Sequence, residues 1–320
     1  MPTCFRFVCW LTATVALAQS AVAFQATKPA PKTVAPKDTS PVLVVVNEQP
    51  ITSAELTRLL QTRKVPEERR GEFRKRFLEQ LIDVHLIHAY LDARQTTAPR
   101  EELDEQVNRL RVMILKEGKD FDKALSEMGY TEKSLRDEMA LPLAWKRHVD
   151  RTVTPTNLKQ YFAEHRPEFD GTKVRASHIL LKVPTATESA ELKTAESKMR
   201  EIRALIIQKK LTFADAAKMY SEGPSKDSGG DIGYFPYTGK MPADFSRIAF
   251  GLKVGEVSEP FRSRFGVHLC VVTERQPGEL SLEDVRDEVL AKMSQELWEK
   301  TVAVLRAAAK IEWKTTGDAP

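Results

Sequence analysis

Two strand-like runs, each containing one histidine, bracket a glycine-rich turn in the second half of this chain of 320 residues. The first run, 174–181, contains His178, and the second run, 267–272, contains His268. Short runs of aliphatic and β-branched residues between turn residues are typical of buried strands. The turn at 229–233 carries three glycines, and glycine enters the backbone conformations of tight turns most readily. The region therefore predicts a folded unit built on buried strands and tight turns.

The order of motifs in this region closely resembles the parvulin family of peptidyl-prolyl cis/trans isomerases. Besides the two histidine runs, it keeps the segments 213–221, 241–245 and 255–261 in the family order. The resemblance implies an α+β fold in which a four-stranded antiparallel sheet is covered by helices. It also implies an isomerase of Xaa-Pro bonds that uses no metal and no other cofactor.

His178 and His268 match the histidine pair of the parvulins, and Ser263 matches a hydroxyl position beside that pair. The resemblance implies that the two histidines lie on neighbouring strands and belong to the active site. A hydrogen bond between the rings requires one donor and one acceptor, so we expect a neutral pair. Two roles are open for these rings: direct participation in bond rotation, or support of the sheet beneath the site.

A pocket for a proline ring requires apolar side chains that converge on a small volume. The residues that match such positions in parvulins, or that lie where an aromatic wall would fit, are Ile232, Met241, Phe245 and Phe265. On composition alone, ordinary core packing explains these four residues as well. The surrounding order of motifs favours the interpretation that these residues line a proline pocket.

Gly223 departs from the family pattern, because parvulins usually carry Cys or Asp at this substrate-binding position. A glycine supplies neither a thiol nor a carboxylate beside the twisting amide. Glu222 is adjacent, but neighbouring residues of an extended chain point to opposite sides. Two hypotheses follow: an isomerase whose activity is reduced, or a non-enzymatic chaperone that binds unfolded clients through a degenerate parvulin domain.

Charge gives no sign of nucleic-acid or phosphate binding. The chain has 49 basic and 45 acidic side chains, a formal net charge of +4, whereas a nucleic-acid surface requires a concentrated basic face. The loop 182–188 has a single lysine and one acid, so we expect no preference for phosphorylated Ser/Thr-Pro segments, which needs several converging cations. No His/Cys group has metal-ligand spacing.

The segment before the parvulin-like region, 42–170, is expected to be an all-helical domain that resembles the N-terminal domain of SurA-type chaperones. It opens with a short strand at 42–46, and Thr52 or Ser53 then caps the first helix. Apolar residues at three- and four-residue intervals predict further helices. Pro142 is expected to disturb the end of one of them.

The last segment, 277–320, contains an amphipathic helix that follows a capping box at 281–284. Its apolar face requires a partner, and the simplest partner is the N-terminal helical domain. The parvulin-like domain, 171–276, would then be an insert between two parts of one chaperone-like domain. This layout resembles the exported foldases of the SurA/PrsA group.

The N-terminus resembles a secretory signal peptide, 1–23, with an apolar stretch before an Ala-Val-Ala cleavage pattern. A linker rich in Pro, Ala and Lys, 24–41, follows and is expected to be disordered. Cleavage would leave Cys270 as the only cysteine and exclude an internal disulfide, so we expect Cys270 to be a small buried side chain. We expect an exported, soluble periplasmic protein whose partners are unfolded or partly folded polypeptides with Xaa-Pro bonds. The alternatives are an uncleaved N-terminal membrane anchor and a peripheral association with the envelope.

Overall fold

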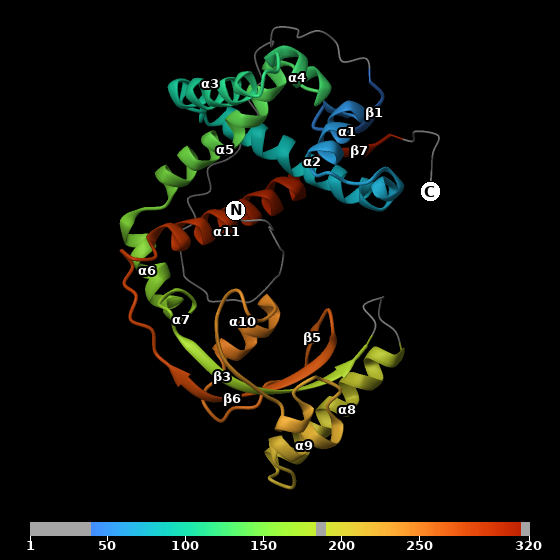
Figure 1. The fold of residues 1–320 in the computed structure, drawn as a ribbon, viewed down its shortest axis with the longest axis vertical. Coiled ribbons are helices and arrows are strands. Elements are labelled where there is room, and N and C mark those ends of the chain that lie inside the picture. The colour runs from blue at the N-terminus through green and yellow to red at the C-terminus, as the bar shows by residue number, and fades with distance from the viewer. Residues whose placement is uncertain (1–39, 184–189, 315–320) are drawn as a thin grey trace. The chain divides into compact units, whose positions relative to one another are not determined.

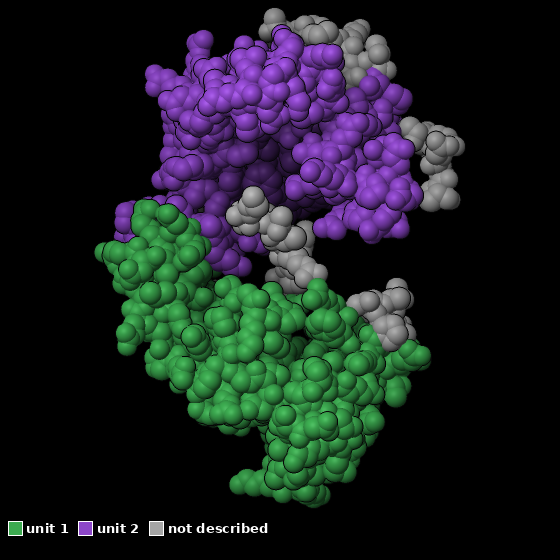
Figure 2. Space-filling view, viewed as in Figure 1, with its two compact units in different colours: residues 1–24, 158–289 green, residues 25–157, 290–320 purple. Residues whose placement is uncertain are grey.

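A computed structural model of the protein describes residues 40–183 and 190–314. The expected signal peptide and nearly all of the expected linker lie outside the described residues. The described chain forms two compact units, shown in different colours in Figure 2. Unit 1 consists of residues 158–183 and 190–289, and unit 2 of residues 40–157 and 290–314. Within these residues, no helix combines the length and the apolarity that crossing a membrane requires.

Unit 1 is built on a four-stranded antiparallel sheet with the strand order β4-β3-β6-β5. Its strands are β3 (Lys173–Lys182), β4 (Asp231–Pro236), β5 (Phe261–Ser263) and β6 (Gly266–Gln276). The central strands β3 and β6 pair along their length, from Lys173 opposite Gln276 to Lys182 opposite Gly266. The four-stranded antiparallel sheet that the sequence predicted is confirmed, and the two histidine runs are its central strands.

Helices cover both faces of this sheet (Figure 1). They are α8 (Ala190–Ile207) and α9 (Phe213–Tyr220) on one face and α10 (Ala243–Gly251) on the other. Unit 1 also contains α6 (Pro155–Glu164), which begins in unit 2, α7 (Arg166–Phe169) and the 3₁₀ helix η2 (Lys226–Ser228). Side chains alternate between the faces of a strand, so Leu269 packs with α8 and α9, whereas Cys270 packs with α10. Cys270 is fully buried, and burial raises the pKa of its thiol to about 12. The expectation that Cys270 is a small buried side chain is confirmed.

Unit 2 is helical apart from a three-stranded antiparallel sheet with the order β2-β1-β7. Its elements are β1 (Val42–Val46), β2 (Gln49–Thr52), α1 (Ser53–Thr62), the 3₁₀ helix η1 (Glu67–Arg69), α2 (Arg70–Ala93), α3 (Arg100–Lys116), α4 (Phe121–Glu127), α5 (Glu132–Thr152), α11 (Arg286–Ala308) and β7 (Ile311–Trp313). The predicted first strand is confirmed, and so is the helix cap, since Thr52 Oγ1 accepts a hydrogen bond from the Glu55 amide. The sequence did not predict β7, because a three-residue strand is too short to show alternation.

Helix α11 closes the core of unit 2. Val302 of α11 packs in one cluster with Leu91 of α2 and Trp145 of α5. Trp145 Nε1 donates a hydrogen bond of 3.0 Å to Ser294 Oγ of α11. Arg306, near the end of α11, forms ion pairs with two acids of α2. Apolar burial and polar contacts therefore attach the C-terminal helix α11 to α2 and α5.

Helix α5 continues through Pro142, so the expectation that this proline disturbs the end of the helix is wrong. An interior proline removes one backbone hydrogen bond and costs roughly 3 kcal/mol. Leu143, Trp145 and Val149, which follow it, are buried. Burial of such side chains contributes about 1.5–3 kcal/mol each, which offsets the cost of the proline.

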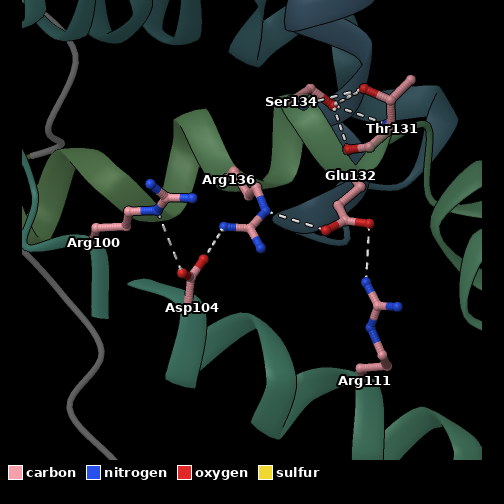
Figure 3. Close-up of polar contacts among 7 residues, drawn as sticks. All are labelled: Arg100, Asp104, Arg111, Thr131, Glu132, Ser134 and Arg136. Atoms are coloured by element: carbon pink, nitrogen blue, oxygen red, sulfur yellow. Dashed lines mark hydrogen bonds and ion pairs between the residues drawn. The ribbon is translucent and has the colours of Figure 1, made fainter. Parts of the chain in front are cut away.

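A chain of charged side chains joins α3 to α5 (Figure 3). Arg136 of α5 donates to Asp104 of α3 at 2.5 Å and to Glu132 at 3.1 Å. Glu132 also accepts from Arg111 of α3 at 2.9 Å, and Arg100 lies 3.9 Å from Asp104. Acids and bases alternate along this chain, so each charge has an opposite charge as its neighbour.

Candidate active site

The strand register places both histidines on the face of the sheet that α10 covers. His178 lies opposite Cys270, and Leu180 lies opposite His268, which in turn lies opposite Phe261 of β5. Residues directly opposite each other in an antiparallel pair point to the same face, and so do residues two apart along a strand. The two histidines therefore stand on neighbouring strands and on one face.

Aromatic rings surround the histidines. The ring of Phe245, which is 1% exposed, meets the rings of His178 and His268 edge to face at centroid distances of 5.8 and 5.9 Å. Phe261 stacks on His268 at 5.4 Å and meets Phe245 at 5.7 Å. Edge-to-face contacts are favourable because ring edges are positive and ring faces negative. The four rings form a packed cluster on the sheet, which we call the ring cluster.

The two imidazole rings lie side by side without a hydrogen bond between them, so the expected bond is wrong. Their centroids are 5.8 Å apart and their planes are tilted by 31°. His268 Nε2 shares a hydrogen bond of 2.6 Å with Ser263 Oγ. Both ring nitrogens of His178, and Nδ1 of His268, are buried without a hydrogen-bond partner in the described chain. The register explains this arrangement: His178 lies opposite Cys270, so the histidines are diagonal neighbours, which are farther apart than a direct pair.

Burial keeps both imidazoles uncharged at neutral pH. It lowers the pKa of His268 to about 4, with the charge of His178 as a smaller cause. Burial also lowers the pKa of His178. A charged ring would lose its hydration in this environment, which disfavours the protonated form. These directions agree with the expected neutral pair.

Three of the four predicted pocket residues come together: Phe245 belongs to the ring cluster, and Ile232 and Met241 pack against the apolar cluster that contains it. Ile232 of β4 and Met241, in the loop before α10, are half-buried. Their partial exposure distinguishes them from the fully buried core beneath.

Phe265 is more exposed than these three residues, and its backbone amide donates a hydrogen bond of 3.0 Å to Ser263 Oγ. It is 45% exposed, and its ring faces the guanidinium of Arg264 at 4.7 Å. The aromatic ring beside His268 is instead that of Phe261, which the sequence analysis did not assign to the site. The signal that could have found Phe261 is its position two residues before Ser263, on the same face of β5.

Gly223 lies directly against His178. A Cβ atom at residue 223 would lie 3.2 Å from His178 Nε2 and 3.3 Å from Ser221 Oγ. The backbone of Gly223 is not in the left-handed region, so a side chain at this position would not strain the backbone. A substituent would require a shift of a few tenths of an ångström from its neighbours.

The segment that contains Gly223 is attached to the edge of β3. Ser221 Oγ accepts a hydrogen bond of 3.2 Å from the Leu180 amide. The Glu222 carboxylate accepts a hydrogen bond of 2.7 Å from the Lys182 amide. Glu222 is therefore engaged at the end of the strand and does not replace a side chain at residue 223. From residue 184 on, the loop in which phosphate selectivity was considered lies outside the described residues.

The described site offers two neutral rings, a hydroxyl group and an apolar surface. Among residues 40–183 and 190–314, no three His, Cys, Asp or Glu side chains converge in a way that could hold a metal ion. The geometry is better suited to binding an apolar ring against uncharged aromatic side chains than to transferring protons.

Comparisons with known proteins agree with this geometry. Residues 178–274 match the rotamase family, described as a PPIC-type PPIASE domain. Foldase protein PrsA of Geobacillus sp. (strain WCH70) is 32% identical over 234 residues, which cover 71% of this chain and 76% of that protein. Chaperone SurA of Hahella chejuensis (strain KCTC 2396) is 31% identical over 229 residues, which cover 62% of this chain and 51% of that protein.

A crystal structure of the peptidylprolyl isomerase PrsA from Bacillus cereus aligns with 87% of this chain and 95% of its own length, at 22% identity and a TM-score of 0.44. The identity and coverage shared with the Geobacillus foldase are sufficient to assign a family. The chain therefore belongs to the PrsA foldases, and it is a folding catalyst with a parvulin-type peptidyl-prolyl cis/trans isomerase domain.

Proposed function

We propose that this foldase isomerises Xaa-Pro bonds of unfolded or partly folded polypeptides, with the proline ring bound among Ile232, Met241 and Phe245. The observation that carries the proposal is the contact of Phe245 with two neutral histidine rings beneath it. Ile232 and Met241 pack against the apolar cluster that contains Phe245 and are partly accessible. Together these side chains form an apolar surface above the rigid, uncharged histidine rings.

The chemistry of the reaction suits such a surface. Rotation about a peptide bond breaks amide resonance and has a barrier of about 18–20 kcal/mol. For Xaa-Pro bonds, uncatalysed rotation takes tens to hundreds of seconds, which is slow enough to limit folding. The twisted amide has lost its charge-separated resonance form, so an apolar, water-poor surface favours the twisted state over the planar ground state. Bond rotation requires no covalent intermediate.

We assign His178 and His268 a supporting role beneath the pocket. Their side chains are buried, and three of their four ring nitrogens are inaccessible. The fourth nitrogen, His268 Nε2, is bonded to Ser263. A substrate amide outside the ring cluster therefore has no direct path to these nitrogens. The rings instead fix the position of Phe245, and Ser263 fixes His268.

The pocket is tested by Met241→Ala and Phe245→Ala, with kcat/KM measured on short Xaa-Pro peptides and divided by the folded fraction. For Met241→Ala we expect kcat/KM to fall about tenfold, which is the effect of removing one or two buried methylene groups from the binding surface. Phe245→Ala should also destabilise the domain, by about 3–5 kcal/mol. A control is Ile207→Ala, since Ile207 is exposed at the end of α8 on the other side of the sheet. Unchanged turnover per folded molecule in both pocket variants would rule out this pocket.

A second activity, binding of unfolded clients by unit 2, is favoured by exposed apolar side chains. Large apolar residues that are 44–55% exposed occur at the end of α3 and just after α4: Val112, Met113, Leu115 and Met128. Exposed apolar groups that gather in one region mark interaction sites. Replacing the three α3 residues by serine should reduce suppression of client aggregation and leave turnover of short peptides unchanged.

We also propose that the protein is exported and acts in the periplasm, with domains at 42–170, 171–276 and 277–320. The Ala-Val-Ala pattern before Phe24 supports cleavage of a signal peptide. N-terminal sequencing of the protein from the periplasmic fraction should begin at Phe24. A membrane-bound protein that retains residues 1–23 would instead support the anchor.

A further inference from the structure

Lys240 is an exposed residue in the loop between β4 and α10, and its ammonium group is bound to β4. Nζ donates hydrogen bonds to the backbone carbonyl oxygens of Tyr234 at 2.7 Å and Ile232 at 3.3 Å. β4 is an edge strand of its sheet, so carbonyl groups of alternate residues on its outer side have no strand partner. Lys240 binds two carbonyls that are spaced in this way.

The loop has few other attachments in its middle. Gly239 adopts a φ of +95°, a region that glycine enters without steric cost. Among the described residues, no backbone–backbone hydrogen bond ties 238–241 to a neighbouring segment. The ends of the loop are held, since the ring of Tyr237 meets that of Phe250 at 5.1 Å and Pro242 is the N-cap of α10. The two bonds from Lys240 therefore add a polar attachment to this part of the loop, where Met241 also packs against the apolar cluster that contains Phe245.

This attachment lies beside the proposed proline pocket. Lys240 directly precedes Met241, and one of its acceptors is the carbonyl of Ile232. The side chains of Met241 and Ile232 both pack against the cluster of Phe245. A long lysine side chain loses rotamer freedom when it is held in one geometry, and two hydrogen bonds from a charged donor can compensate for this loss.

We propose that Lys240 is a positioning residue of the isomerase, which fastens the loop to β4 and thereby holds Met241 against Ile232. The inference rests on the proposed proline pocket. Lys240 acts through Met241, and the substrate binds to the apolar side chains that this contact places. In a variant without the ammonium group, substrate binding must order the loop. The free-energy cost of this ordering lowers the affinity for the substrate. Rotation of the bond, once the proline is bound, takes place over the same ring cluster.

The test is Lys240→Met, which keeps most of the apolar stem and removes the donors, with kcat and KM measured separately on an Xaa-Pro peptide. We expect KM to rise about fivefold, as for the loss of one ordinary hydrogen bond, because the exposed ammonium group also exchanges these bonds with water; kcat should be nearly unchanged. Lys240→Arg retains N–H donors and should restore KM to within about twofold of wild type. The matched control is Lys218→Met, because Lys218 is an exposed lysine on α9, which packs on the other face of the sheet.

The outcomes separate failure of this inference from failure of the pocket. If Met241→Ala raises KM but Lys240→Met does not, Lys240 has no positioning role and the pocket stands. If neither Met241→Ala nor Phe245→Ala changes the kinetics, the pocket is wrong and the role of Lys240 falls with it. In the double variant Lys240→Met/Met241→Ala, the two effects should be less than additive, since one residue acts through the other. Full additivity, or an arginine variant as impaired as the methionine variant, would overturn the inference.

Discussion

At the scale of the single residue, His268 makes the isomerase domain sensitive to acid. The ordinary pKa of its imidazole is 6.5, and burial lowers the pKa in the folded protein to about 4. Below the ordinary pKa the unfolded chain therefore binds more protons than the folded chain, so stability falls as pH is lowered from about 6.5 to about 4. The part of this loss in the free energy of unfolding that is due to His268 is roughly 3 kcal/mol. His178 contributes in the same direction, because burial lowers its pKa as well.

This dependence can be measured by denaturant unfolding of wild type and His268→Phe at about pH 7.5 and about pH 4.5, on either side of most of the transition. Other titrating groups are common to both proteins, so the difference between their pH dependences isolates His268. We expect the loss of stability in acid to be smaller in the variant. Equal losses in the two proteins would show that His268 is not a buried neutral ring.

Gly223 is the residue at which the isomerase and chaperone hypotheses lead to different expectations. A side chain at this residue would point toward His178 Nε2, a buried nitrogen without a partner in the described chain. Gly223→Asp or Gly223→Cys should therefore supply a polar partner and raise turnover of Xaa-Pro peptides. Gly223→Ala is the control, because it adds the same Cβ atom without a polar group. If turnover is undetectable in all of these proteins while aggregation suppression persists, the chain is a chaperone with a degenerate isomerase domain.

Local sequence signals found part of the site. The positions of His178, His268 and Ser263 followed from motif order, and Ser263 does bond to His268. The sequence did not show that the imidazoles are diagonal neighbours, because the strand register decides which residues face each other. Lys240 was missed because its acceptors are backbone carbonyls, which carry no residue-specific signal.

At the scale of the element, the ion-pair chain between α3 and α5 should contribute little stability. Arg136, Asp104 and Glu132 have side chains that are 34%, 41% and 38% exposed, and pairs of this kind contribute about 0–1 kcal/mol. Arg136→Met should therefore lower the free energy of unfolding only slightly at low salt and by less at high salt, because salt screens exposed charges.

Arg109→Met is the matched control for Arg136→Met. The ion pair of Arg109 with Glu105 lies within α3 and is more exposed, at 65% and 70%. Arg109→Met should therefore lower the free energy of unfolding by less than Arg136→Met does in the same denaturant titration. A loss of several kcal/mol for Arg136→Met, independent of salt, would mean that Arg136 holds the helices by packing and not by charge.

Elements with strong periodicity were predictable, whereas elements whose existence depends on distant partners were not. Helices were expected in this part of the chain from apolar spacing, and α3 is one of them, with Pro99 as its N-cap and Glu117 as its C-cap. β7 exists because Val44–Val46 of β1, at the other end of the chain, bond to it. Pro142 was misjudged because its local cost is visible in the sequence, whereas the burial of Trp145 and Val149 is visible only in the fold.

At the scale of the whole molecule, the two compact units have separate apolar cores. The cores of unit 1 lie on the two faces of its four-stranded sheet. One core of unit 2 is formed by α2, α5 and α11, with Trp145 buried in it. Because apolar burial is the main favourable contribution to folding, a cavity in one core should destabilise the unit that contains it. Catalysis on a short peptide should depend on unit 1, where the ring cluster lies.

Two reciprocal variants in the full chain test this separation. Trp145→Ala should lower the stability of unit 2 by about 3–5 kcal/mol and leave turnover of a short Xaa-Pro peptide unchanged. Phe245→Ala should abolish most of the turnover and leave unit 2 as stable as before. Unfolding of unit 2 can be followed by tryptophan fluorescence, since the described tryptophans, Trp145, Trp298 and Trp313, all lie in it. Hydrogen exchange of β3 and β6 reports on unit 1. Loss of peptide turnover in Trp145→Ala, with exchange in β3 and β6 unchanged, would show that the helical unit takes part in the reaction itself and does more than bind clients.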